Sequence, residues 1–260
     1  DALPPIETGP KPDVSRDDCP DADSTLVYLV TEQNELMSYH PPSGTFRTIG
    51  LIACPAAVSA SPFSMAVDRK GTAFVLFSDG SLFRVSTATA ACARVAYTPG
   101  QSGFQTFGMG FSTDGLGPSE SLFVAGDGQG TSASGLATID TTTFKLTAIR
   151  DFFPSIDRAE LTGTGDGHLY AFYTKIGVAG SFVGELDKTN ARILAESRLA
   201  GVEQGQGWAF AFWGGDFYLF TAPGGSSVVT RFRPTDGSVA EVGSWPSVIV
   251  GAGVSTCAPQ

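Results

Sequence analysis

Two large side chains stand out at one position of a repeated segment. Glu160 and Trp208 each occupy the second place of a six-residue segment that opens a repeat unit, and the same place elsewhere holds Ser64, Gly108 and Gly251. A carboxylate beside an indole can hold a sugar, because the apolar face of a sugar ring stacks on the aromatic ring while its hydroxyl groups donate to the carboxylate. We therefore expect Glu160, Trp208 and Ser64 to form a ligand-binding site.

Other roles for these two side chains stay open. Trp208 can fill the space between neighbouring repeat units, and Glu160 can accept hydrogen bonds from the backbone N–H groups of a connecting loop. Hydrolysis of a glycoside needs two carboxyl groups about 5–10 Å apart, and this position supplies only Glu160. The other candidate carboxylates lie at non-equivalent places in their units: Asp68, Asp114, Glu120 and Asp166.

A second equivalent position, four residues further along, is polar in four of the five units. It holds Asp68, Ser112, Thr164, Phe212 and Ser255. A polar ring there can hold ordered water or a cation such as Ca²⁺, which takes oxygen ligands. One carboxylate makes a weak cation site, so we expect water, and we predict no bound metal ion and no other cofactor.

The repeat that carries both positions predicts the architecture. Five openers occupy residues 63–68, 107–112, 159–164, 207–212 and 250–255. The first four are each followed by an apolar run and by further short strands, which gives units of about forty to fifty residues, typical of β-propeller blades. The fifth opener precedes only the C-terminus, whereas residues 26–49 show strands without an opener.

The C-terminal opener and the N-terminal strands together make up one complete repeat unit. The sequence predicts an all-β, five-bladed β-propeller of four-stranded blades, in which the C-terminal segment 248–256 pairs with residues 25–31 of the N-terminal blade and closes the ring. Closure protects two sheet edges that would otherwise be open to other chains. The propeller is expected to be a single domain, residues 24–260.

Residues 1–23 are rich in Pro and Asp and show no strand pattern. Such segments cannot bury enough apolar surface to fold alone, so we predict a disordered N-terminal tether. In exported bacterial proteins a tether of this kind commonly separates a lipid anchor from a domain, although a plain disordered terminus explains the composition equally well. The start at Asp1, without a Met or a signal peptide, is what a processed chain would show.

The four cysteines lack C-x-x-C spacing, and the chain has only two His, so we do not expect a metal site. An even count in a Gly-rich β domain favours disulfides in an oxidising compartment, with free buried thiols as the alternative. Cys257 ends the innermost strand of the split blade, and Cys19 lies just before the next strand of that blade. The propeller therefore favours the pairs Cys19–Cys257 and Cys54–Cys92.

Charge and composition exclude several classes of partner. The net charge is −10 with only 16 Lys and Arg, which argues against nucleic acid and against anionic membrane surfaces, because both attract clustered basic residues. No apolar run approaches the about 20 residues of a membrane-spanning helix, so we expect no membrane insertion. The motifs of serine hydrolases, zinc proteases and P-loop proteins are also absent.

Three blade endings, at residues 36–45, 135–143 and 184–190, resemble the final hairpin of PQQ-like, NHL-like and kelch-like propeller repeats. Residues 24–257 also resemble exported bacterial propeller proteins that end in Gly-Ala-Gly-Val-Ser-Thr-Cys, here residues 251–257. The resemblance implies a propeller and a secreted or cell-envelope location, and it implies no activity. The PQQ-type tryptophan motif does not recur, so cofactor binding does not carry over.

We therefore expect an exported binding module, secreted or held in the cell envelope in the periplasm or at the outer membrane. It is expected to be a monomer that recognises a glycan or an envelope protein on the face where the innermost strands begin, without catalysis. Two other classes remain open: a glycoside hydrolase or lyase of the five-bladed type, and a non-catalytic protein-interaction scaffold.

Overall fold

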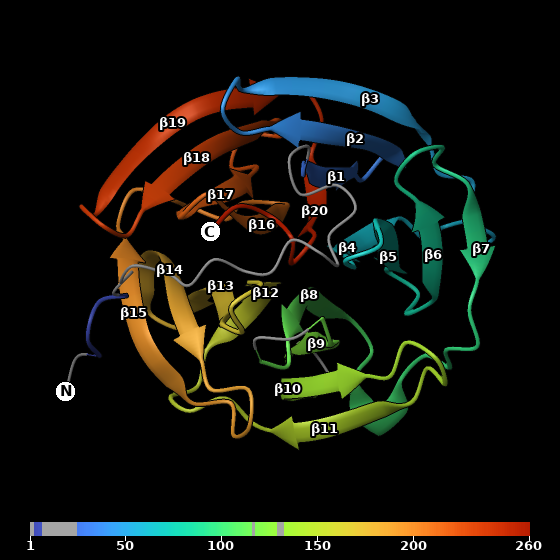
Figure 1. Ribbon diagram of the computed structural model, residues 1–260, viewed down its shortest axis with the longest axis horizontal. Helices are drawn as coiled ribbons and strands as arrows, with labels where there is room; N and C mark the ends of the chain where they lie inside the picture. Colours follow the sequence, from blue (N-terminus) through green and yellow to red (C-terminus); the bar gives the residue numbers. More distant parts are fainter. Residues whose placement is uncertain (1–2, 7–24, 116–117, 129–132) are drawn as a thin grey trace.

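The computed structural model describes residues 3–6, 25–115, 118–128 and 133–260. Within these residues, five sheets of four antiparallel strands each are arranged in a ring around a central axis (Figure 1). The molecule is a five-bladed β-propeller, which confirms the predicted fold class.

The blades follow one another along the chain. Blade one consists of β20 (Ile249–Val254), β1 (Val27–Thr31), β2 (Glu35–His40) and β3 (Thr45–Leu51), from the axis outward. Blade two contains β4 (Pro62–Val67), β5 (Thr72–Phe77), β6 (Leu82–Ser86) and β7 (Cys92–Arg94), and blade three contains β8 (Phe107–Thr113), β9 (Glu120–Asp127), β10 (Ser134–Ile139) and β11 (Leu146–Arg150). Blade four contains β12 (Asp157–Gly163), β13 (Leu169–Lys175), β14 (Val178–Leu186) and β15 (Ile193–Leu199), and blade five contains β16 (Trp208–Trp213), β17 (Asp216–Thr221), β18 (Ser227–Arg233) and β19 (Ser238–Trp245).

Blade one combines the two ends of the propeller. Its innermost strand β20 pairs antiparallel with β1, so that Val254 lies opposite Val27 and Ala252 opposite Leu29. In Figure 1 the red strand β20 lies beside the blue strand β1 near the axis. A strand from the C-terminal end of the domain thus completes the blade that the N-terminal part begins.

The hydrophobic core lies between the blades. One cluster joins blades four and five, where Phe172, Phe210 and Phe217 are buried together and the rings of Phe210 and Phe217 stack with centroids 5.3 Å apart. The outermost strands are more exposed, as the largely exposed strand β19 illustrates. Each blade buries its faces only against its neighbours, which explains why blades occur in closed sets.

Glycine allows the innermost strands to approach closely. A Cβ atom at Gly108 would lie 2.1 Å from the backbone oxygen of Ala159, and one at Gly251 would lie 2.8 Å from the backbone nitrogen of Met65. Further along the same strands, Gly110 faces Leu161. The innermost strands therefore run in the same direction. We call the face where they begin the entrance face and the face where they end the exit face.

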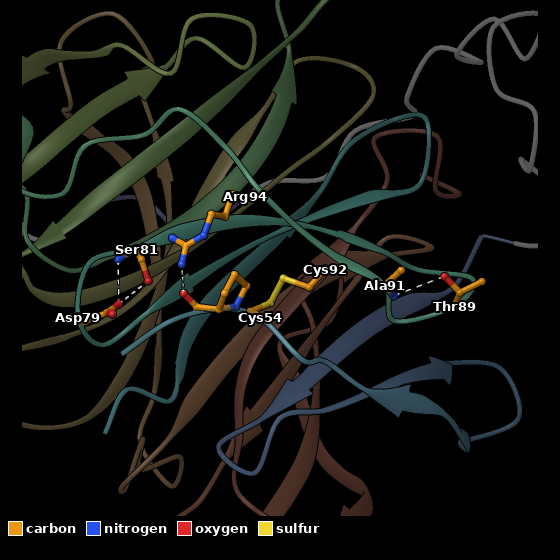
Figure 2. Close-up of a disulfide and its surroundings, with 8 residues drawn as sticks. Cys54, Asp79, Ser81, Thr89, Ala91, Cys92 and Arg94 are labelled. Atoms are coloured by element: carbon orange, nitrogen blue, oxygen red, sulfur yellow. Dashed lines mark hydrogen bonds between the residues drawn. A yellow bond between two sulfur atoms is a disulfide. The ribbon is translucent and has the colours of Figure 1, made fainter. Parts of the chain in front are cut away.

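The disulfide Cys54–Cys92 links the segment after β3 to the outermost strand of blade two, which confirms this predicted pair (Figure 2). Near it the Arg94 guanidinium donates to the Pro55 carbonyl at 2.6 Å. Cys19 lies outside the described residues, so the pair Cys19–Cys257 stays a prediction. A structural disulfide is typical of extracellular and periplasmic proteins.

Part of the predicted tether packs on the propeller. The backbone N–H of Glu196 in β15 donates to the Pro4 carbonyl at 2.8 Å, and Ile6 is buried in the cluster between blades four and five. Residues 3–6 thus lie against blade four, whereas the rest of the predicted tether is outside the described residues. In the described part of the chain, no helix is long and apolar enough to cross a membrane.

Candidate functional site

A cavity of about 190 Å³ opens on the entrance face over the axis. Four blades supply its walls: Glu32 and Val250 from blade one, Ser61, Pro62 and Phe63 from blade two, Glu160 from blade four, and Gln206, Gly207 and Trp208 at blade five. Further along the axis, the crevice between Met109 and Leu161 leaves no room for a water molecule. The cavity is therefore a shallow depression with Glu160 in its wall.

Glu160 and Ser64 meet beside this cavity. The Ser64 hydroxyl donates to Glu160 Oε2 at 2.8 Å, and the Met109 N–H donates to Ser64 Oγ at 3.1 Å. Ser64 is fully buried, and Glu160 is 3% exposed. The two residues lie on blades two and four, so the bond passes over blade three, where Gly108 has no side chain. The structure thus brings together two residues of the predicted ligand site.

The surroundings of Glu160 favour its neutral form. Burial raises the pKa of its carboxyl well above the usual range, and hydrogen bonds from Ser64 and from the Met109 backbone only partly oppose this shift. A neutral carboxyl can donate one hydrogen bond and still accept others, whereas a carboxylate only accepts. Glu160 can therefore pair with either kind of polar group on a ligand.

Trp208 contributes both to the cavity and to the core. Its side chain is half-buried and packs against the cluster between blades four and five. The Arg158 guanidinium lies over the indole, 4.6 Å from the ring centroid. The ring face that we expected to be free for a sugar is therefore covered by a cation on at least one side. The buried Trp208 Nε1 has no hydrogen-bond partner among the described residues.

Irregular strand pairing shapes the rim of the cavity. The register between β12 and β13 shifts between Asp157 and Glu160, and within this bulge Arg158 has a φ of 33°, which is rare for a residue with a side chain. A second shift lies between Pro62 and Ser64 in β4. Bulges redirect side chains and are common beside functional sites, and the bulge in β12 is where Arg158 reaches over Trp208.

The residues of the second predicted position have partners elsewhere. Asp68 Oδ1 accepts from the N–H groups of Lys70 and Thr72, and the Ser112 hydroxyl donates to the His168 carbonyl at 2.9 Å. Thr164 donates to Asp166, and Ser255 accepts from the Cys257 N–H at 3.1 Å. Across the described ranges no group of three or more His, Cys, Asp and Glu side chains is placed to hold a metal ion. Axial water or a cation at this position stays a prediction.

Sequence reasoning missed three polar residues of the site. Glu32 and Gln206 line the cavity from loops between strands, and Arg158 covers Trp208. None of them occupies a position compared across the repeats: Glu32 and Gln206 lie in loops, which vary between blades, and Arg158 lies in the bulge of β12. In the sequence, only the short separation between Arg158 and Glu160 along one strand indicates that Arg158 lies near the site.

No protein-family model and no curated protein sequence matches this chain. Among solved structures, a chain from the crystal structure of the nidogen/laminin complex is similar to it, with a TM-score of 0.56 and 11% sequence identity over 89% of this chain and 98% of that one. Hydrazine synthase of Kuenenia stuttgartiensis has a TM-score of 0.49 and 15% identity, over 90% of this chain and 68% of that one. TolB from Acinetobacter baumannii has a TM-score of 0.48 and 13% identity, over 92% of this chain and 56% of that one. At 11% identity, the likeness to the chain from the nidogen/laminin complex shows the β-propeller fold alone.

Proposed function

We propose that the protein is an exported, monomeric binding module that recognises a glycan, or another hydroxyl-rich component of the cell envelope, at the entrance cavity. The observation that carries the proposal is the buried Glu160 carboxyl, which lines a solvent-open cavity beside Trp208. A propeller presents such a cavity on a rigid scaffold and is well suited to binding or interaction.

The lining of the cavity supports a small polar ligand. Glu32 and Gln206 are exposed, whereas Glu160 is buried, so polar groups are available both at the rim and inside. Phe63 and Trp208 add apolar surface. Small-molecule sites usually measure about 300–1,000 Å³. A cavity of about 190 Å³ therefore fits one ring of a larger molecule, whose remainder lies across the entrance face.

In this proposal the edge of the Trp208 ring contacts the ligand, and its face supports Arg158, which also contacts the ligand. Because the guanidinium lies over the indole, the ligand meets an arginine supported by an aromatic ring instead of a bare indole face. Arginine in this setting donates several hydrogen bonds in a fixed plane. Sugar hydroxyls accept such bonds as readily as they donate to Glu32.

One observation favours glycoside hydrolysis as a second candidate. The cavity is lined by two carboxyl groups in different environments, the buried Glu160 and the exposed Glu32, and glycosidases use one protonated and one ionised carboxyl. Binding ranks first, because hydrolysis needs two carboxyl groups held about 5–10 Å apart, and the second one here, that of Glu32, is exposed in a turn. Glu160→Gln separates the two candidates, since a hydrolase variant would keep ligand binding and lose turnover.

A glycan array probed with the full chain tests the proposal. We expect at least one glycan to bind, and Glu32→Gln to weaken that binding several-fold. Glu241→Gln is the matched control, because Glu241 is exposed on the outermost strand β19, away from the axis. If no glycan binds, or if both variants bind as the natural chain does, the proposal is wrong.

A further inference from the structure

A second, larger cavity of about 650 Å³ lies on the exit face between blades two and three. Its walls include the turn after β4, the beginning of β5 and the turn between β10 and β11. This volume lies within the range of small-molecule sites. Asp68, from the second position compared across the repeats, lines this cavity, whereas its other walls come from non-equivalent parts of the two blades.

Two cations in this cavity have no acidic partner. Lys70 and Arg84 both line it and are exposed, and within the described residues neither forms an ion pair. In a chain whose net charge is −10, two uncompensated cations in one concave site are unexpected. A bound anion would supply the missing charge.

Arg84 is held in a fixed orientation. Its guanidinium lies 5.6 Å from the Phe74 centroid and 5.2 Å from the Phe144 centroid, and its Nη2 donates to the Thr141 carbonyl at 2.7 Å. A guanidinium has five N–H donors, so donors remain for a ligand. Because the side chain is already ordered, binding an anion loses little further side-chain entropy.

The acidic residues of the cavity are engaged within the protein. Asp68 accepts hydrogen bonds from two backbone N–H groups of its own turn. Glu120 accepts from the Arg69 N–H at 2.7 Å and from the Thr256 hydroxyl at 2.8 Å. Both carboxyl groups thus act as structural acceptors, while the two cations remain available to a ligand.

We propose that this cavity binds a small hydroxyl-bearing organic anion, whose carboxylate or phosphate group is held by Lys70 and Arg84. The apolar part of the ligand lies against Phe74 and Phe111, and its hydroxyl groups bond to the side chain of Thr72. The site is separate from the entrance cavity and does not depend on the function proposed there.

Proton uptake accompanies binding at this site. Burial, with a smaller contribution from Asp68, raises the pKa of Glu120 to about 7, while the Arg69 charge and the two hydrogen bonds oppose the shift. Lys70 and Arg84 are the other charged residues that line the cavity. An anion bound beside Glu120 favours its neutral form, so affinity for a carboxylate ligand, which stays ionised over this range, rises as the pH falls from about 8 to 6.

Isothermal titration calorimetry of the full chain with three probes of similar size tests the inference. Glucuronate carries a carboxylate, glucose 6-phosphate carries a phosphate, and methyl glucoside is uncharged. We expect at least one of the two anions to bind, with the stronger one identifying the acidic group, and the neutral sugar to bind at least about tenfold more weakly. The inference is wrong if neither anion binds up to about 10 mM, or if the neutral sugar binds this cavity equally well, which a matching loss of its affinity in Lys70→Gln would show.

Variants locate the binding. Lys70→Gln and Arg84→Gln are each expected to lower the affinity for the anion about tenfold or more. Arg192→Gln is the matched control, since Arg192 is also exposed and lies over an aromatic ring, 5.4 Å from the Phe153 centroid. If Arg84→Gln disturbs folding, Lys70→Gln decides alone, because Lys70 is a surface side chain. Unchanged affinity in Lys70→Gln would place any observed binding elsewhere and overturn the inference.

Discussion

Ser64 and Glu160 are joined by a hydrogen bond of 2.8 Å across the propeller axis, although 96 residues separate them in the sequence. The bond connects blades two and four, and Ser64 also accepts the Met109 N–H of blade three. One hydroxyl thus links three of the five blades at the entrance face.

Removing this hydroxyl tests its structural contribution. Ser64→Ala removes one hydrogen bond from the buried Glu160 carboxyl and one acceptor from the Met109 N–H, so we expect the free energy of unfolding to fall by about 1–3 kcal/mol. Denaturant unfolding measures the change. Thr147→Ala, at an exposed position of β11, is the control and should change stability by less than about 0.5 kcal/mol. Equal stability of the two variants would contradict this interpretation of Ser64.

Stability should depend on pH through Glu120. Its pKa in the folded protein is about 7, above the ordinary value of 4.5, so the folded state binds the proton more tightly than the unfolded state. This contribution is fully present below about pH 4.5 and is lost as the pH rises through about 7, by roughly 2–3 kcal/mol. The unfolding midpoint should fall as the pH rises from about 5 to about 8.5, and in Glu120→Gln it should depend less on pH. If the stability of Glu120→Gln and that of the control Glu241→Gln fall equally as the pH rises, Glu120 is not the group that causes the pH dependence.

Trp208 and Trp245 form a matched pair for separating binding from packing. Both are half-buried, and each has a buried indole N–H without a hydrogen-bond partner in the described part of the chain. Trp208 lines the entrance cavity, whereas Trp245 packs on Phe46 at the outer edge, with centroids 4.9 Å apart. Each change to Ala should cost about 2–4 kcal/mol of stability by thermal melting, but only Trp208→Ala should weaken glycan binding, by roughly 1–3 kcal/mol. If Trp208→Ala keeps full affinity for the glycan, Trp208 contributes to packing and not to binding.

The pairing of β20 with β1 predicts the effect of a truncation. Deleting residues 246–260 removes the innermost strand of blade one, which leaves the edge of β1 unpaired and removes the packing of β20 against β4 and β16, so we expect cooperative unfolding to be lost. Calorimetry of the full and truncated chains measures this directly. A truncated chain that melts in one transition at the original temperature would show that the ring does not need this strand.

The sequence was sufficient to predict the blades, because the openers and the apolar runs that follow them recur with the spacing of strands in a propeller. It also placed Ser64 and Glu160 at one level of the axis. That their side chains meet depends on the absence of a side chain at Gly108, which only the packed strands reveal. The position of Arg158 over Trp208 depends on a bulge in β12, and bulges interrupt the alternation on which sequence reasoning relies.

The exit-face cavity was beyond prediction for a different reason. Lys70 follows β4, Arg84 lies within β6, and Glu120 begins β9, so these residues belong to non-equivalent places of two blades. Comparing equivalent positions across repeats cannot bring them together. The sequence offers Glu120 only as a candidate carboxylate at a non-equivalent place in its blade, and its contact with Thr256 requires the turn after β20 to reach blade three.

The central claim is that the entrance cavity holds the ligand, and the indole N–H signals of the three tryptophans test it most directly. Trp208 lines the cavity, whereas Trp213 donates its Nε1 hydrogen to the Thr25 carbonyl at 2.9 Å at the far end of β16, and Trp245 lies at the outer edge. In a nuclear magnetic resonance titration with a glycan identified on the array, with signals assigned by Trp→Phe variants, we expect the Trp208 signal to shift and saturate while the other two stay in place. A glycan that binds without moving the Trp208 signal would contradict the claim.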